Sequence, residues 1–288
     1  MTTPRQVGPI LKAATDYLDA KGIESPRVAA EMLMGRLVRC RPMELPLRFN
    51  DTLSEKHIAA MRRGIKRVAG GEPVQHIIGE TGFYGHTFKT DKRALIPRPE
   101  TEVLVEAMLA HEHLWTRSQP VIVDVGTGSG CIAVSLAKAR PEALYLAFDI
   151  SDEALSLARE NAKALGVDGQ ITFSSQDLAD ALEPELIDGI AANLPYIASD
   201  AVAALPIEVR DHEPSAALDG GPDGLQVIET LIEDAGILLK PGGVLFLEIG
   251  ADQAARVRSL LEAAGFDRIN VQQDLAGRDR VVSAQREP

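Results

Sequence analysis

The spacing of hydrophobic residues changes character along this chain. Residues 9–20, 27–38 and 54–70 carry apolar side chains at helical spacing. Serine or a Ser-Pro pair opens the second and third of these segments, and a double glycine ends the third. The pattern therefore predicts a small helical bundle over residues 1–73.

A connecting segment follows the predicted bundle. Residues 75–90, QHIIGETGFYGHTFKT, have β character interrupted by glycines, which predicts a hairpin linker over residues 74–98. The sequence LIPRPETE then combines two prolines with acidic residues that open a helix over residues 100–109.

From Val121 onward, short apolar strands alternate with helices. The alternation predicts an α/β domain over residues 99–288, with a parallel, Rossmann-like sheet covered by helices on both faces. The last two strands are joined by a short turn, which adds an antiparallel strand to that sheet. The predicted strands are VIVDV, LYLAFDI, ITFSSQD, LIDGIAAN, VLFLEIG, FDRINVQQD and RVVSAQ, and the predicted helices are CIAVSLAKA, EALSLARENAKAL, LQVIETLIEDAGILL (capped by Lys240-Pro241-Gly242-Gly243) and QAARVRSLLEAA.

The composition is typical of a soluble globular protein, with 45% hydrophobic and 25% charged residues over 288 positions. No signal peptide and no segment of membrane-spanning length is evident. The two cysteines, Cys40 and Cys131, match no metal-ligand spacing. We therefore expect a cytoplasmic protein that needs neither a metal nor a membrane.

The net charge of −12 is unevenly distributed. Up to Gly85 the chain has 13 Lys+Arg against 9 Asp+Glu, about +4, whereas the remainder has 17 against 33, about −16. Non-specific binding to nucleic acid depends on neutralising phosphates, which an acidic main domain disfavours. We expect no stable nucleic-acid partner.

A glycine-rich loop, Gly126-Thr127-Gly128-Ser129-Gly130, lies between a predicted strand and a predicted helix. Glycines let the backbone turn tightly and approach a ligand closely, beside the N–H groups that open the helix. Nicotinamide enzymes use a similar loop, but their spacing is G-x-G-x-x-G, and no second mononucleotide-binding half follows here. The loop predicts a ligand site and disfavours a dinucleotide.

Polar residues also end the next two strands. Asp149 closes the second strand, 23 residues after Gly126, where a carboxylate can accept both ribose hydroxyls of an adenosine. Asp177 and Leu178 close the third strand, where the carboxylate can accept the adenine amino group and the leucine can cover the ring. Each has a structural alternative, a helix cap for Asp149 and a surface turn for the other two.

The tetrapeptide Asn193-Leu194-Pro195-Tyr196 follows the fourth predicted strand, at the sheet edge where ligands bind in α/β folds. The Asn193 oxygen and the Leu194 carbonyl can accept the two N–H bonds of a planar nitrogen, and Tyr196 can stack on its plane. Pro195 stiffens the backbone. Taken alone, the four residues are more typical of a strand-to-loop turn.

Longer segments match one family. LIPRPETE and EPSAALDGGPDGL are the most diagnostic, and FYGHTF, VDVGTGSGCIAVSLA, LKPGGVLFLEIG and DLAGRDRVV accompany them. With these segments the chain resembles the release-factor glutamine methyltransferases, the PrmC/HemK family, over essentially its whole length. The resemblance implies a class I methyltransferase that uses S-adenosylmethionine, with an antiparallel last strand and an N-terminal helical domain for substrate recognition.

The same resemblance implies a reaction and assigns residues to it. The family methylates the side-chain amide nitrogen (N5) of the glutamine in the Gly-Gly-Gln motif of class I peptide-chain release factors. Catalysis and substrate binding then fall to the Asn193–Tyr196 segment, and cofactor binding to Asn193 and the three strand ends described above. We expect a monomer whose partner is a release factor.

The chain departs from the family motif, Asn-Pro-Pro-Tyr, at Leu194. A backbone carbonyl is available from either residue, and Leu194 precedes a proline and is therefore kept extended. Asn-Leu-Pro-Tyr also resembles the motif of ribosomal-RNA adenine dimethyltransferases, so an adenine-N6 methyltransferase acting on RNA or DNA is one alternative. A cofactor-binding module without catalysis is another.

The sequence leaves the flanking segments undecided. Phe83, Tyr84 and Phe88 can line a glutamine channel or simply pack the linker. Arg98 and Glu100 can pair with each other or shape the cofactor pocket. The loop over residues 198–223 is long enough to act as a lid.

Overall fold

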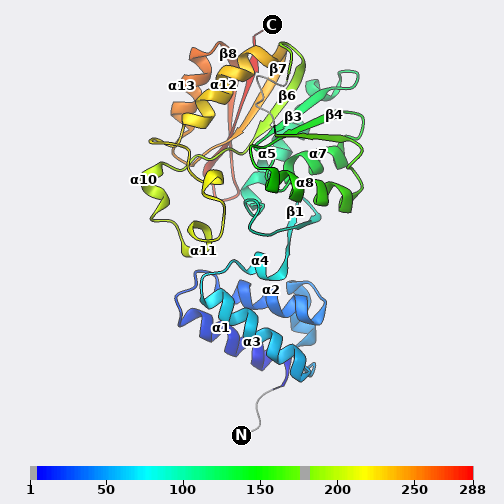
Figure 1. Ribbon diagram of the computed structural model, residues 1–288, viewed down its shortest axis with the longest axis vertical. Helices are drawn as coiled ribbons and strands as arrows, with labels where there is room; N and C mark the ends of the chain where they lie inside the picture. Colours follow the sequence, from blue (N-terminus) through cyan, green and yellow to red (C-terminus); the bar gives the residue numbers. More distant parts are fainter. Residues whose placement is uncertain (1–4, 176–181, 288) are drawn as a thin grey trace. The chain divides into compact units, whose positions relative to one another are not determined.

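The computed structural model describes residues 5–175 and 182–287 of the chain (Figure 1). These residues form two units. The first comprises the described residues up to Glu80 together with Pro206–His212, and the second comprises the rest.

The first unit is helical, as the apolar spacing predicts. Ser54 caps its longest helix by accepting a hydrogen bond from the His57 backbone N–H at 3.2 Å. Ser25 occupies the N-cap position of another helix without a side-chain bond, and Pro26 begins that helix. The elements around its core, which includes Leu18, Met34 and Leu45, are α1 (Val7–Asp19), α2 (Pro26–Val38), η1 (Pro42–Arg48), α3 (Glu55–Ala69) and α4 (Val74–Ile78). The unit also includes α11 (Ile207–Arg210), which has no buried residue.

The predicted hairpin is shorter than expected, because its first residues form α4. The two strands are β1 (Glu80–Phe83) and β2 (His86–Lys89), joined by a turn in which Tyr84 and Gly85 have φ values of 47° and 74°. Positive φ values at both central residues suit the two-residue turns that join strands with a right-handed twist.

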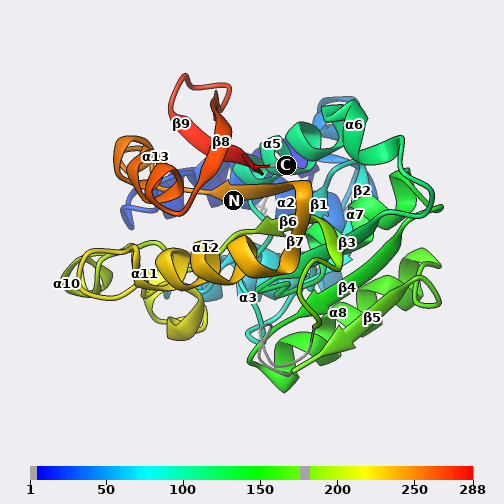
Figure 2. The same cartoon turned by 90° about the horizontal axis from the view of Figure 1, so that it is seen from above.

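The second unit is built on a seven-stranded sheet in the order β5-β4-β3-β6-β7-β9-β8 (Figure 2). The first five strands in that order are parallel, and β9 runs antiparallel to both of its neighbours. This confirms the predicted fold class and its antiparallel last strand. The strands are β3 (Val121–Val125), β4 (Leu144–Phe148), β5 (Ile171–Ser174), β6 (Ile187–Ala192), β7 (Leu239–Glu248), β8 (Phe266–Gln273) and β9 (Asp279–Arg286).

Helices cover both faces of this sheet, and each face has its own hydrophobic core. One core contains side chains of α5 (Pro99–Ala110), α6 (Glu112–Trp115), α7 (Cys131–Ala139) and α8 (Asp152–Leu165). The other contains side chains of α12 (Gln226–Leu238) and α13 (Ala254–Ala263).

Strand β7 contributes to both cores by alternation. Val244 and Phe246 belong to the core of α5 and α7, whereas Leu245 and Leu247 belong to the core of α12 and α13. The alternation therefore directs the next residue, Glu248, toward α5.

Two connections differ from the prediction. Lys240-Pro241-Gly242-Gly243 does not follow the helix as a cap but lies inside β7, as a bulge between the Ile187–Leu239 and Gly189–Val244 pairs. The loop after β6 contains short helices, α10 (Ser199–Val202), α11 and η2 (Ser215–Ala217). Every helix in the described ranges is too short or too polar to span a membrane.

Candidate functional site

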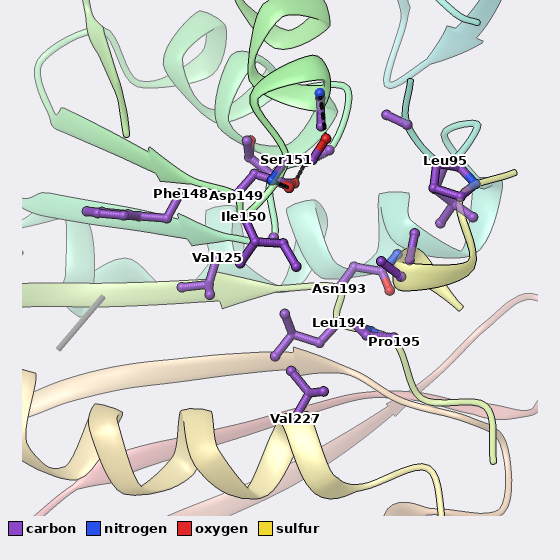
Figure 3. A pocket seen from close by; sticks show the side chains of 18 of the residues that line it. Leu95, Val125, Phe148, Asp149, Ile150, Ser151, Asn193, Leu194, Pro195 and Val227 are labelled. Carbon is purple, nitrogen blue, oxygen red and sulfur yellow. Dashed lines mark hydrogen bonds between the residues drawn. The ribbon is translucent and has the colours of Figure 1, made fainter. Parts of the chain in front are cut away.

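A cavity of about 870 Å³ lies where the carboxyl ends of β3, β4 and β6 meet (Figure 3). It brings together most of the residues that the sequence predicts for the site, namely Gly126, Thr127, Gly128, Ser129, Asp149, Asn193, Leu194 and Pro195. Gly130 and Tyr196 are not part of its lining, and Asp177 and Leu178 lie outside the described residues.

The glycine loop is held in place by a buried acid that the sequence analysis did not single out. Asp124, inside β3, accepts hydrogen bonds from the Thr127 hydroxyl at 2.6 Å and from the Ala133 backbone N–H in α7 at 3.0 Å. Burial raises the pKa of Asp124 to about 6. This acid ties the loop between the strand and the helix that it joins.

The glycine-loop backbone also closely approaches residues Asn193–Tyr196, which we call the acceptor segment. Gly126 has a φ of 69°, and a Cβ placed on it would lie 3.0 Å from Cδ2 of Leu194. Only glycine combines that φ with so little space. The loop and the acceptor segment therefore pack against each other at the cavity wall.

Asp149 faces the same cavity and is oriented by two backbone groups. Its two carboxylate oxygens accept bonds from the N–H of Gly128 at 2.8 Å and of Ser151 at 2.9 Å. Ser151, not Asp149, caps α8, since its hydroxyl oxygen accepts a bond from the Ala154 N–H at 3.2 Å. Each Asp149 oxygen keeps a lone pair for a ligand.

Ile150 is a lining residue that the sequence analysis missed. Its side chain is 88% exposed although it is large and apolar, and it borders the cavity beside Asp149 (Figure 3). An exposed apolar group at a cavity mouth is suited to cover a flat ring. The sequence signal that could have identified Ile150 as a lining residue is its position directly after Asp149, the acid at the end of the strand.

Asn193 is oriented by a residue 92 positions earlier. Its Nδ2 donates a hydrogen bond to the Thr101 hydroxyl oxygen at 3.0 Å. Among the described residues, none donates to the Asn193 Oδ1 or to the Leu194 carbonyl oxygen. Two hydrogen-bond acceptors on consecutive residues of the cavity lining are thus left free of protein partners.

The side chain of Leu194 is part of the core. It is 7% exposed and belongs to the cluster of α12 and α13, and Figure 3 shows it directed toward Val227. The leucine that replaces the family's proline is therefore accommodated by packing, and Leu194 remains a lining residue of the cavity.

Tyr196 is anchored below the cavity rather than lining it. Its hydroxyl donates to Oε1 of Glu248 at 3.5 Å, and its backbone carbonyl accepts a bond from Gln253 Nε2 at 2.9 Å. The pKa of Tyr196 is raised to about 12, mainly by burial and secondly by the nearby Glu248 carboxylate.

The glycines of the ALDGGPDGL segment support this backbone. A Cβ on Gly224 would lie 2.4 Å from the Tyr196 carbonyl oxygen, and one on Gly220 would lie 2.5 Å from the Pro195 carbonyl oxygen. The chain can pass so close to the acceptor segment only without side chains at these positions.

The two prolines of LIPRPETE present Arg98 to a distant acid. Arg98 Nη2 donates to both oxygens of Glu213 at 2.6 and 2.8 Å, and the Glu213 side chain is 1% exposed. Glu100 instead lies 3.3 Å from Arg278. The local Arg98–Glu100 pairing is therefore wrong, whereas Arg98 does line the cavity.

The aromatic residues of FYGHTF pack the linker. Phe83 and Phe88 are 1% and 0% exposed, with ring centroids 5.9 Å apart in an edge-to-face arrangement. The backbone N–H of Tyr84 donates to Glu102 at 2.9 Å. The described cavity lining includes none of the three aromatic residues.

Comparisons with known proteins agree with this architecture. A model of the PrmC N-terminal domain matches residues 10–79, and a model of the methyltransferase small domain matches residues 99–207. The chain is also similar to the hMettl16 catalytic domain, solved in complex with the MAT2A 3′UTR hairpin 6, with a TM-score of 0.56 over 70% of this chain and 76% of that one. At 17% identity this likeness concerns the fold alone.

Similarity in sequence is much higher to a set of bacterial proteins. The release factor glutamine methyltransferase of Cereibacter sphaeroides is 43% identical over 95% of this chain and 96% of its own. That of Moorella thermoacetica is 42% identical over 96% of this chain and 97% of its own. Because this identity extends through both the helical unit and the cavity-bearing unit, the chain belongs to the release factor glutamine methyltransferase family, which confirms the resemblance seen in its motifs.

Proposed function

We propose that this protein transfers a methyl group from S-adenosylmethionine to the side-chain amide nitrogen of the Gly-Gly-Gln glutamine in class I release factors. Family membership supports the reaction class and the type of protein substrate. The single observation that carries the proposal is the pair of free acceptors, Asn193 Oδ1 and the Leu194 carbonyl, at the cavity. A primary amide has two N–H bonds, and two acceptors can hold both.

The cavity fits S-adenosylmethionine. Its volume, about 870 Å³, is in the range of ligand and cofactor sites. We assign the ribose hydroxyls to Asp149, whose oxygens keep free lone pairs, and the adenine ring to the exposed face of Ile150. Gly128 leaves room for the cofactor beside the loop backbone, since a Cβ placed on it would have no neighbour closer than 3.9 Å. When bound, S-adenosylmethionine supplies a methyl group already activated by its sulfonium.

The protein's own contribution is alignment. With Nδ2 committed to Thr101, Asn193 presents Oδ1 to the amide, and Leu194 presents its carbonyl. Two accepted hydrogen bonds fix the amide plane and raise electron density on its nitrogen. Pro195 stiffens the segment, and the buried anchor of Tyr196 holds it from below. The amide nitrogen becomes acidic once it is alkylated, so no general base has to act first.

Mass spectrometry of the Gly-Gly-Gln peptide tests the proposal. We expect one added methyl group on the glutamine after a class I release factor is incubated with the protein and S-adenosylmethionine. A release factor whose motif glutamine is replaced by asparagine should remain unmodified. Absence of methyl transfer to the intact release factor would overturn the assignment.

The rival substrate is an adenine in RNA or DNA, which also presents an exocyclic N–H₂ group. The charge of about −16 beyond Gly85 opposes the approach of a phosphate backbone. Labelled methyl transfer to ribosomal RNA or DNA, but not to release factor, would favour this rival.

We also propose that the protein acts as a monomer in the cytoplasm, where release factors function.

A further inference from the structure

A buried acid beneath the acceptor segment has no role in the mechanism described so far. Glu248 ends β7, is 1% exposed, and faces α5 by strand alternation. Its Oε2 has no hydrogen-bond partner among the described residues. A carboxylate in such a place is costly, which suggests a purpose other than stability.

A single side chain, that of Thr101, connects Glu248 to the side-chain amide of Asn193. The Thr101 side chain interacts with the Glu248 carboxylate and lowers its pKa, and its hydroxyl oxygen accepts a hydrogen bond from Asn193 Nδ2 at 3.0 Å. Thr101 is 2% exposed, so water does not compete for these interactions. Tyr196 donates to the same carboxylate at 3.5 Å.

The chemistry of these groups decides which end of the Asn193 amide faces the cavity. An ionised carboxylate can only accept, so the one hydrogen of the Thr101 hydroxyl points to Glu248. The hydroxyl then offers only lone pairs to Asn193, which must turn Nδ2 toward Thr101 and Oδ1 away from it. The reverse orientation would place two N–H donors opposite the N–H bonds of the substrate.

We propose that Thr101 and Glu248 are positioning residues that set the orientation of the Asn193 amide and thereby make it an acceptor for the glutamine. This inference rests on the proposed function, since it concerns the same amide substrate. Protonated Glu248 no longer requires the hydrogen of the Thr101 hydroxyl, and the preference for the productive orientation is lost.

The orientation should therefore respond to pH near neutrality. The pKa of Glu248 is raised to about 7, mainly by burial and also by Glu100 on α5, against the lowering effects of Thr101, Arg280 on β9 and the Tyr196 hydroxyl. The ionised form is the productive one. We expect kcat to rise with pH through about 7 and to level off above it.

We call the connection from Glu248 through Thr101 to Asn193 the relay. Three variants test it by measuring methyl transfer. Thr101→Val keeps the shape but removes both hydrogen bonds, so kcat at high pH should fall about tenfold, whereas Thr101→Ser should restore most of it. Glu248→Gln cannot ionise, so its kcat should lose the rise through about 7. Thr116→Val and Glu262→Gln, at exposed positions, are the matched controls and should retain the wild-type rate and profile.

A measurement without turnover separates this inference from the proposed function. The Asn193 side-chain N–H₂ signals, assigned by nuclear magnetic resonance from their loss in Asn193→Ala, should shift with a midpoint near 7 in the wild type. The shift should be absent in Glu248→Gln and present in Glu262→Gln. If these signals titrate as expected but no release factor is methylated, the proposed function fails and the relay stands.

The relay is overturned by either of two results. One is a Thr101→Val protein that methylates release factor at the wild-type rate. The other is an Asn193 titration that is unchanged in Glu248→Gln. Calorimetry with S-adenosylmethionine and thermal unfolding verify that each variant is folded and binds cofactor, and Glu248→Gln serves as the test if Thr101→Val does not fold.

Discussion

The two halves of the cavity are held together in different ways. On the glycine-loop side, the fixing bonds are local in sequence: Thr127 bonds Asp124 three residues earlier, and Gly128 bonds Asp149, 21 residues later. On the acceptor side, Asn193 is oriented by Thr101, 92 residues earlier, and Glu213 is held by Arg98, 115 residues earlier. A cofactor site can thus be assembled within one strand–helix–strand segment, whereas the acceptor site depends on the complete sheet.

The largest expected effect is on the acceptor side. Replacing Asn193 with alanine removes one of the two acceptors, and methyl transfer to release factor should fall by about 100- to 1,000-fold. The dissociation constant for S-adenosylmethionine should change much less, because its fixing groups are elsewhere. Single-turnover kinetics and calorimetry measure the two quantities. Asn270→Ala, at an exposed position, is the control. An equal loss of cofactor affinity would contradict the separation of the two halves.

The next effect concerns the long-range ion pair. Arg98→Met removes the ion pair that Arg98 Nη2 makes with both oxygens of the buried Glu213, and the free energy of unfolding should drop by about 3 kcal/mol. Denaturant unfolding measures it. The exposed Arg256–Asp223 pair is the matched control, since Arg256→Met should cost about 0.5 kcal/mol or less. Adding Glu213→Gln to Arg98→Met should recover part of the loss. An additive further loss would show that the pair does not stabilise the segment.

On the cofactor side, Asp149→Ala should weaken S-adenosylmethionine binding by about 10- to 100-fold, because bonds to a charged acceptor are lost. Methyl transfer at saturating cofactor should fall much less. The neighbouring, exposed Asp152 supplies the control variant Asp152→Ala. Titration calorimetry distinguishes the two, and equal affinities for both variants would remove Asp149 from the site.

The smallest expected effect is a difference in the free energy of unfolding between two glycine variants. It distinguishes the cost of backbone strain from the cost of a close contact. Gly224 and Gly277 both have a φ of 75°, but a Cβ would meet the Tyr196 carbonyl at the first and nothing within 4 Å at the second. Replacing either with alanine should cost about 1 kcal/mol for the conformation. Gly224→Ala should cost about 1–2 kcal/mol more for the contact. If denaturant unfolding gives the same loss of unfolding free energy for both variants, the backbone of the acceptor segment can move to accommodate the new Cβ at little cost.

Prediction from the sequence succeeded where the determining contacts are close along the chain. The helices of the first unit, the alternating strands and the antiparallel last strand all follow from periodicity and turn residues. It failed where a partner was distant: Lys240-Pro241-Gly242-Gly243 was expected to cap a helix, but these residues form a bulge inside β7. The pairs that Leu239 and Val244 make with β6, on either side of the bulge, hold this stretch in the sheet, and no local spacing encodes them.

The site shows the same limit. Asn193 and Asp149 could be identified from their places at strand ends, and the segment LIPRPETE could be recognised as diagnostic. The partners of that segment could not be identified, because Glu213 and Asn193 are far from it in sequence and no local spacing encodes their approach. Glu248 is detectable in LFLEIG only as a charge within an apolar strand.

The sequence by itself determined the fold class and the glycine loop, and it pointed to Asn193 and Leu194 as the proposed acceptor residues, since each depends on neighbours close along the chain. The tertiary structure decided which atoms remain free to act. The Asn193 oxygen faces away from Thr101 because Thr101 accepts a hydrogen bond from its Nδ2, and we propose that Glu248 sets this direction. A side-chain amide is a donor and an acceptor at once, and only its buried neighbours determine which of the two it offers.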